Sequence, residues 1–172
     1  MIELITDSTS DLSPELLERY HIKRVPLSVF VDGKDLKDGD LTLAQLFDAV
    51  ERTGELPKTS AVPVAEFQQL FSSPNDVIYI GLSSQLSATH QNAILATAEI
   101  EGKRIAVIDS LNLSTGIGLL VLKAAQMRDQ GASFDEIVEQ VHALIPKVHT
   151  SFVIDTLEYL YKGGRCSALA NI

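Results

Sequence analysis

The residues best suited to chemistry follow short apolar runs of the sequence. Three of these runs end in an aspartate and a hydroxyl side chain: Ile5-Thr6-Asp7-Ser8, Val107-Ile108-Asp109-Ser110 and Val153-Ile154-Asp155-Thr156. If the runs are parallel strands of an α/β sheet, their carboxyl ends share one edge, where such folds bind ligands. We therefore expect a functional edge, although each aspartate, serine or threonine taken alone is more often a helix cap or a turn former.

A denser group of hydroxyl side chains occupies residues 81–90, Gly-Leu-Ser-Ser-Gln-Leu-Ser-Ala-Thr-His. This segment follows a predicted strand and opens a predicted helix, in whose first turn we expect Ser87. Hydroxyls, free backbone N–H groups and the positive end of a helix dipole together favour the binding of an anion. Residues 114–118, Ser-Thr-Gly-Ile-Gly, repeat the arrangement. Two capped helices without a ligand remain the alternative.

The same segment approaches the Gly-x-Ser-x-Gly nucleophile elbow of α/β hydrolases, with Ser83 or Ser84 as the nucleophile. However, Gln85 stands where the elbow requires its last glycine. His90 follows on the predicted apolar face of the helix, where a histidine is more often a core residue than a general base. A serine hydrolase-like enzyme is therefore the weaker alternative, and we assign no catalytic residue.

The sequence shows no clear pattern of metal ligands. The four histidines show no ligand spacing, and Cys166 is the single cysteine. The carboxylates of Asp7, Asp109 and Asp155 could bind Mg²⁺, but no Gly-x-x-x-x-Gly-Lys loop accompanies them. We expect these aspartates to organise loops through backbone N–H groups, with no metal and no cofactor.

Composition restricts the class of protein further. The chain has 172 residues, 45% of them hydrophobic and 22% charged, which is typical of a folded domain. The net charge of −9, with no basic stripe, argues against nucleic acid and anionic lipid surfaces as partners. No apolar run approaches the roughly 18 residues of a membrane span. The first residues lack a basic signal-peptide region, so we expect a cytoplasmic protein without stable membrane insertion.

Apolar periodicity predicts an α/β domain over residues 1–160. Strands are expected at residues 2–6, 25–31, 77–81, 104–108 and 150–154, buried on both faces. Capping boxes at Thr42 and Ser133, and Ser13 before a proline, predict three helix starts. Residues 32–40 are expected as an exposed loop and residues 54–63 as an irregular connection. The alternation of strands and helices predicts an open, largely parallel sheet with helices on both faces.

The remaining helical segments are predicted from apolar stripes at helical spacing. The stripes are Leu43, Leu46, Phe47 and Val50; Val64, Phe67, Leu70 and Phe71; Leu86, His90, Ala93, Ile94 and Thr97; Ile117, Leu120, Val121, Ala124 and Ala125; and Phe134, Ile137, Val138, Val141, Leu144 and Ile145.

Five motifs, in order along the chain, resemble the signatures of the DegV family. They are Thr6-Asp7-Ser8-Thr9-Ser10-Asp11-Leu12, Pro57-Lys58-Thr59-Ser60, Leu82-Ser83-Ser84-Gln85-Leu86-Ser87-Ala88-Thr89, Val107-Ile108-Asp109-Ser110 and Leu157-Glu158-Tyr159-Leu160-Tyr161-Lys162-Gly163-Gly164-Arg165. The resemblance implies the Rossmann-like N-terminal domain of a DegV-like protein. It also implies that residues 161–172 begin a linker to a second domain absent from this chain.

The resemblance further implies a carrier that is not an enzyme. Such a carrier binds one long-chain fatty acid, whose carboxylate Thr59 and Ser87 would hold, and presents it to a fatty acid kinase. Secondary site residues would be Ser60, Ser84, Asp7, Asp109 and Arg165. A binding protein for another small carboxylate or for phosphate is the alternative. We expect Thr59 and Ser87 to gather with Asp7 and Asp109 at the carboxyl edge of the sheet.

The chain departs from the family pattern at three places. Ala61-Val62-Pro63 replaces the usual Gln-Pro after the Thr-Ser pair, and Ala88 replaces a glycine. The chain also ends where the second domain of the family begins, and the acyl chain lies between the two domains in the family. An exposed apolar cleft would favour self-association of this chain.

Overall fold

The computed structural model describes residues 1–164, which fall into two compact units. The first unit comprises Met1–Leu27 and Ala61–Thr150, and the second comprises Ser28–Ser60 together with the chain from Ser151 onward. The second unit is thus built largely from a segment inserted between two parts of the first. The predicted extent of the α/β domain, residues 1–160, stays a prediction.

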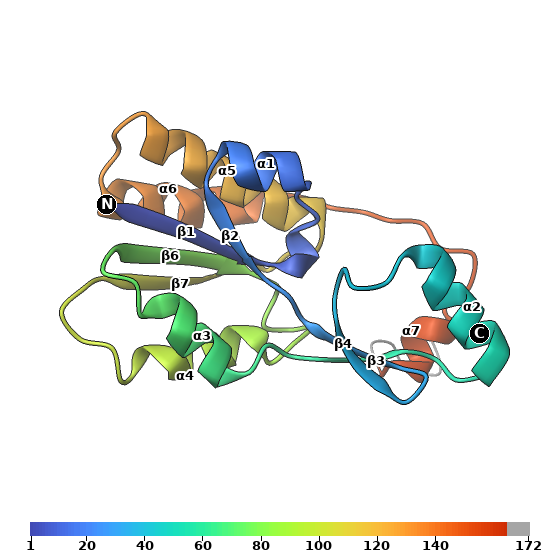
Figure 1. The fold of residues 1–172 in the computed structure, drawn as a ribbon. Helices are drawn as coiled ribbons and strands as arrows, with labels where there is room; N and C mark the ends of the chain where they lie inside the picture. The colour runs from blue at the N-terminus through green and yellow to red at the C-terminus, as the bar shows by residue number, and fades with distance from the viewer. Residues whose placement is uncertain (165–172) are drawn as a thin grey trace. The chain divides into compact units, whose positions relative to one another are not determined.

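A four-stranded parallel sheet forms the centre of the first unit (Figure 1). Its strands are β1 (Ile2–Asp7), β2 (Ile22–Val25), β6 (Asp76–Gly81) and β7 (Ile105–Asp109), in the order β2-β1-β6-β7. Asp7 pairs with Val25, and Gly81 pairs with Asp109, so the strands end together at one edge. The register therefore brings the loops that follow β1, β6 and β7 to the same side, as predicted.

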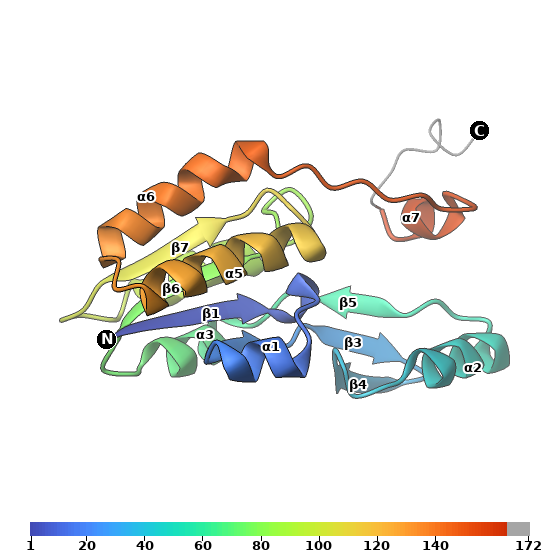
Figure 2. The ribbon, with the colours of Figure 1, turned by 90° about the horizontal axis from the view of Figure 1, so that it is seen from above.

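Helices cover both faces of this sheet. They are α1 (Pro14–Arg19), α3 (Val64–Phe71), α4 (Thr89–Thr97), α5 (Thr115–Asp129) and α6 (Phe134–Leu144), with the short 3₁₀ helices η1 (Ser8–Ser10) and η2 (Ile145–Lys147). Helices α1, α5 and α6 lie on one face, and α3 and α4 lie on the other (Figures 1 and 2). The predicted α/β class, an open parallel sheet with helices on both faces, is confirmed for this unit.

The core of the first unit follows most of the predicted stripes. The stripe predicted for α5 is buried, with Ile117, Leu120, Val121, Ala124 and Ala125 at most 1% exposed, whereas Leu119 on the opposite face is 60% exposed. Phe67 and Phe71 of α3 pack against Tyr79 of β6 with ring centroids 5.0 and 6.4 Å away. The stripe predicted for α4 is wrong in part, although Ala93 is buried as expected. Leu86 precedes the helix, Ile94 is 41% exposed, and the buried face consists of Thr89, Ala93 and Ala96. Small side chains on this face let α4 lie close to its neighbours.

The second unit is a small antiparallel sheet with two helices. Its strands are β3 (Ser28–Val31), β4 (Lys34–Lys37) and β5 (Lys58–Ser60), in the order β4-β3-β5, and its helices are α2 (Leu43–Thr53) and α7 (Glu158–Lys162). Asp32 and Gly33, with φ of 52° and 69°, form the tight turn between β3 and β4. The prediction of loops throughout residues 32–40 and 54–63 is therefore wrong where β4 and β5 form.

Two predicted strands differ from the structure for identifiable reasons. Residues 25–31 do not form one strand, because Pro26 lacks the N–H group that a continuing ladder requires and separates β2 from β3. Residues 150–154 form no strand. Phe152 is 68% exposed and Val153 is 98% exposed, so this run has the strand-forming residues but no neighbouring ladder. Consequently, the exposed Asp155 does not follow a strand.

Candidate functional site

Asp7 ends β1 and organises the carboxyl edge of the sheet in the first unit. The residue is fully buried, and its Oδ2 accepts hydrogen bonds from Tyr79 Oη at 2.7 Å and from Leu82 N at 2.8 Å. Its Oδ1 accepts from the backbone N–H of Thr9 at 3.0 Å and from the Thr9 hydroxyl. A buried carboxylate needs such donors. Asp7 therefore joins the loop after β1 to the start of the loop after β6.

Gly81 makes the contact between Tyr79 and Asp7 feasible. The Tyr79 side chain lies over Gly81, where a Cβ would stand only 1.9 Å from Tyr79 Oη and 2.6 Å from Asp7 Oδ2. Burial raises the pKa of Tyr79 well above its ordinary value, and the neighbouring Asp7 carboxylate adds to this effect. The phenol therefore stays protonated and donates to Asp7.

Asp109 ends β7 and holds the same loop from the other side. Its Oδ1 accepts hydrogen bonds from Ser84 N at 3.1 Å and from Leu111 N at 3.0 Å. Partial burial opposes ionisation of Asp109, but the hydrogen bonds from Ser84 and Leu111 and the nearby His90 outweigh it and lower the pKa of the carboxyl. The structure thus places both Asp7 and Asp109 as loop organisers, as predicted.

The loop after β6 is a compact turn that presents Ser87. The carbonyl of Ser83 accepts hydrogen bonds from Leu86 N at 3.0 Å and from Ser87 N at 3.2 Å. Ser83 N donates to the carbonyl of Asn112 at 3.1 Å, which fastens the turn to the loop after β7. Two residues of the neighbouring loop, Asp109 and Asn112, therefore hold the turn on which Ser87 lies.

Ser87 lies just before α4, whereas the sequence predicted it in the first turn. Its Oγ accepts a hydrogen bond from Thr89 N at 3.2 Å and lies 2.9 Å from Thr89 Oγ1. Ala88 occupies the N-cap position of α4 and supplies no side-chain hydrogen bond. Ser87 stays outside the helix and bonds its N-terminal region, as capping side chains do. The Ser87 hydroxyl is half-buried and stands at the positive end of a nine-residue helix.

Thr59 and Ser60 belong to the second unit. They lie on β5, where Thr59 pairs with Val29 and Ser60 pairs with Ser28, and both are exposed. Since Thr59 and Ser87 belong to different units, their gathering around one ligand stays a prediction.

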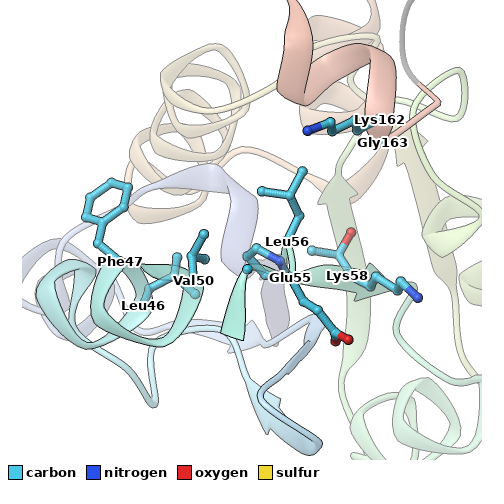
Figure 3. A pocket seen from close by; sticks show the side chains of 11 residues that line it. Leu46, Phe47, Val50, Glu55, Leu56, Lys58, Lys162 and Gly163 are labelled. Atoms are coloured by element: carbon cyan, nitrogen blue, oxygen red, sulfur yellow. The ribbon is translucent and has the colours of Figure 1, made fainter. Parts of the chain in front are cut away.

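A cavity of about 980 Å³ lies beside Thr59 within the second unit. Leu46, Phe47 and Val50 contribute to its lining from α2, and Leu56 and Thr59 contribute from the following segment (Figure 3). The cavity is at the upper end of the 300–1,000 Å³ usual for small-ligand pockets. The stripe predicted on α2 is largely unburied, with Phe47 62% exposed, and three of its members, Leu46, Phe47 and Val50, line this cavity instead of a core.

The hydrolase alternative finds no support in the geometry. Ser83 is buried and its Oγ accepts from Gln85 N at 3.2 Å, whereas Ser84 is exposed. A nucleophilic serine needs a base within hydrogen-bond reach. In the part of the chain that the structure describes, neither hydroxyl is bonded to a histidine. His90 is half-buried, and its Nδ1 is buried without a hydrogen-bond partner among those residues.

Three histidines nevertheless lie near one another. His90, His142 and His149 line a cavity of about 650 Å³ together with Asp109 and Asn112. Within residues 1–164, no group of three or more His, Cys, Asp or Glu side chains is arranged to hold a metal ion. No helix in the same range is long and apolar enough to span a membrane. Arg165, the remaining predicted site residue, lies outside the described residues.

Comparison with known proteins decides the family. The family model described as "Uncharacterised protein, DegV family" matches residues 1–172. This chain belongs to the DegV family. A DegV domain-containing protein of Caldanaerobacter subterraneus is 41% identical over 175 residues, covering 99% of this chain and 62% of the relative.

Two solved structures are similar in fold and larger in size. A fatty-acid-binding DegV family protein of Thermus thermophilus has a TM-score of 0.86 and 32% identity, covering 95% of this chain and 60% of that one. A stearic-acid-binding protein of Eubacterium ventriosum has a TM-score of 0.81 and 29% identity, covering 98% of this chain and 63% of that one. The chain therefore spans less than two thirds of the length of these three proteins.

Several residues that shape the site were not predicted as site residues. Thr89 is hydrogen-bonded to Ser87, and Val62 N donates to Thr89. Tyr79 donates to Asp7, and the carbonyl of Asn112 accepts from Ser83 N, so these two residues hold the surrounding loops. A serine often accepts a hydrogen bond from the backbone N–H two residues later, so Ser87 before Thr89 is a local signal for such a bond. Tyr79 carried no such signal, because its partner Asp7 is 72 residues away.

Proposed function

We propose that this DegV chain binds a long-chain fatty acid and that the hydroxyls of Thr59 and Ser87 hold its carboxylate. One observation carries the proposal: the half-buried Ser87 hydroxyl stands at the N-terminus of α4, where its oxygen accepts from Thr89 N and the N-cap residue Ala88 supplies no side-chain hydrogen bond. A hydroxyl donor and the positive end of a helix dipole both favour an anion. The fatty-acid-binding relatives support the choice of ligand.

The apolar cavity of the second unit supports a site for the acyl chain. Thr59 lies in its lining beside Leu46, Phe47 and Val50, so a hydroxyl donor adjoins an aliphatic and aromatic wall. Each buried methylene contributes about 0.8 kcal/mol, whereas a hydrogen bond to a charged group contributes about 1.5–3 kcal/mol. The acyl chain would then supply most of the affinity, and the two hydroxyls would orient the carboxylate.

The same proposal includes delivery of the bound fatty acid to a kinase that phosphorylates the carboxylate. It rests on membership in the DegV family. In this role the chain acts as a carrier without enzymatic activity or cofactor. A cytoplasmic location and self-association through exposed apolar surface remain predictions.

Titration of purified chain with oleate tests the proposal. We expect Ser87→Ala and Thr59→Ala each to weaken binding about tenfold or more, because each removes one donor to the carboxylate. Ser72→Ala, which removes an exposed hydroxyl at the end of α3, is the matched control and should retain the parental affinity. Parental affinity in the double Thr59/Ser87 variant would reject the assignment. Displacement of oleate by acetate or phosphate would favour a small-anion site instead.

A further inference from the structure

The Ser87 hydroxyl has a nearly complete set of hydrogen bonds within the protein. A serine hydroxyl carries one proton and can accept two hydrogen bonds. Thr89 N, which can only donate, lies 3.2 Å from Ser87 Oγ and occupies one acceptor position. Thr89 Oγ1 lies 2.9 Å from the same oxygen, and distance alone does not say which hydroxyl donates.

The surroundings of Thr89 decide the direction of this bond. Thr89 is 0% exposed, and its Oγ1 accepts a hydrogen bond from Val62 N at 3.4 Å. Among the described residues, Ser87 Oγ is the only acceptor that the Thr89 hydroxyl proton reaches. If Ser87 donated instead, the Thr89 proton would be buried without an acceptor, which proteins avoid. Thr89 therefore donates to Ser87.

From this geometry we propose that Thr89 is a positioning residue for carboxylate recognition, whose buried hydroxyl turns the Ser87 proton outward toward the ligand. The inference rests on the function proposed above. With both acceptor positions of Ser87 filled by Thr89, its own proton must bond a group outside the pair. A carboxylate accepts hydrogen bonds and donates none, so it fits this proton. Successive hydrogen bonds from Val62 to Thr89 and from Thr89 to Ser87 also polarise one another.

Val62 fixes the start of this chain of hydrogen bonds. Its side chain is 0% exposed, its N–H donates to Thr89, and its carbonyl accepts from Asn92 Nδ2 at 2.8 Å. Both backbone polar groups of Val62 are thus bonded to side chains of α4.

Substitutions at Thr89 separate the hydroxyl from the packing. Thr89→Val keeps the shape but removes the hydroxyl, and Thr89→Ser keeps the hydroxyl but removes a buried methyl group. We expect Thr89→Val to weaken oleate binding about threefold to tenfold and Thr89→Ser to stay within about twofold of the parent. Both variants should lower the melting temperature. If Thr89 served only to stabilise the fold, the two variants would therefore lose similar amounts of oleate affinity.

A double-mutant cycle with Ser87→Ala completes the test. If Thr89 acts through Ser87, Thr89→Val causes no further loss of oleate affinity once Ser87 is alanine. An equal loss with and without Ser87, or an equal loss in Thr89→Ser and Thr89→Val, overturns the inference. The Ser87→Ala variant by itself reports on the proposed function. Parental affinity in that variant would show that Ser87 does not bind the carboxylate, and it would also overturn the proposed role of Thr89.

Discussion

Gly81→Ala should destabilise the chain strongly, although the change adds only one methyl group. The new Cβ would lie 1.9 Å from Tyr79 Oη, 2.3 Å from Tyr79 Cζ and 2.6 Å from Asp7 Oδ2. The Tyr79 ring cannot retreat, because it is fully buried and packs at 5.0 Å from the Phe67 ring. The tyrosine must therefore leave its hydrogen bond with Asp7.

The cost can be estimated from these contacts. Overpacking a buried site costs about 1–3 kcal/mol, and losing a hydrogen bond to a buried carboxylate costs about 1.5–3 kcal/mol. Together they lower the free energy of unfolding by about 2.5–6 kcal/mol. For a chain of this size, each kcal/mol shifts the melting temperature by about 2–4 °C, so we expect a decrease of about 5–24 °C.

Circular dichroism during heating, and urea titration of the same samples, measure this loss. Tyr79→Phe is the matched variant, because it removes the hydroxyl without changing the ring and should cost about 1.5–3 kcal/mol by itself. The two substitutions share the same contact, so the double variant should lose less stability than the two single losses added. A Gly81→Ala variant that melts within about 2 °C of the parent would refute the close packing of Tyr79 and Asp7.

Two further predictions concern the groups that hold the site loop. The Tyr79 pKa is raised by burial and by Asp7, so its contribution to stability is fully present below the unfolded-state pKa of about 10. That contribution is lost as pH rises toward the folded-state value, and the tyrosinate absorbance of Tyr79 should appear only as the chain unfolds. Asp109→Ala removes the acceptor of two backbone N–H groups, so hydrogen exchange at Ser84 and Leu111 should accelerate about tenfold. Unchanged exchange at both amides would contradict the role of Asp109.

Features that depend on neighbouring residues in the chain were predictable. Thr42 and Gln45 form the predicted capping box of α2, and Ser133 and Glu136 form that of α6. These bonds join residues three positions apart, so the residue types alone indicate them. The parallel sheet followed from its buried aliphatic strands, because such runs require cover on both faces.

Only part of the candidate site could be predicted from the sequence. The loops after β1, β6 and β7 were expected to converge, because strand ends of a parallel sheet share an edge, and the structure brings Asp7, Ser87 and Asp109 to these loops. The prediction of Thr59 came from the DegV motif alone, and no local pattern on β5 distinguishes it from its neighbours.

The tertiary structure decided those features that depend on residues far apart in the sequence. The aliphatic run at residues 150–154 resembles the real strands, yet it has no ladder and stays exposed. The Tyr79–Asp7 bond spans 72 positions, and the Val62–Thr89 bond spans 27. A local sequence pattern determines which backbone conformation a segment favours. Whether a strand pairs, or in which direction a hydroxyl donates, depends on which groups the fold brings beside it.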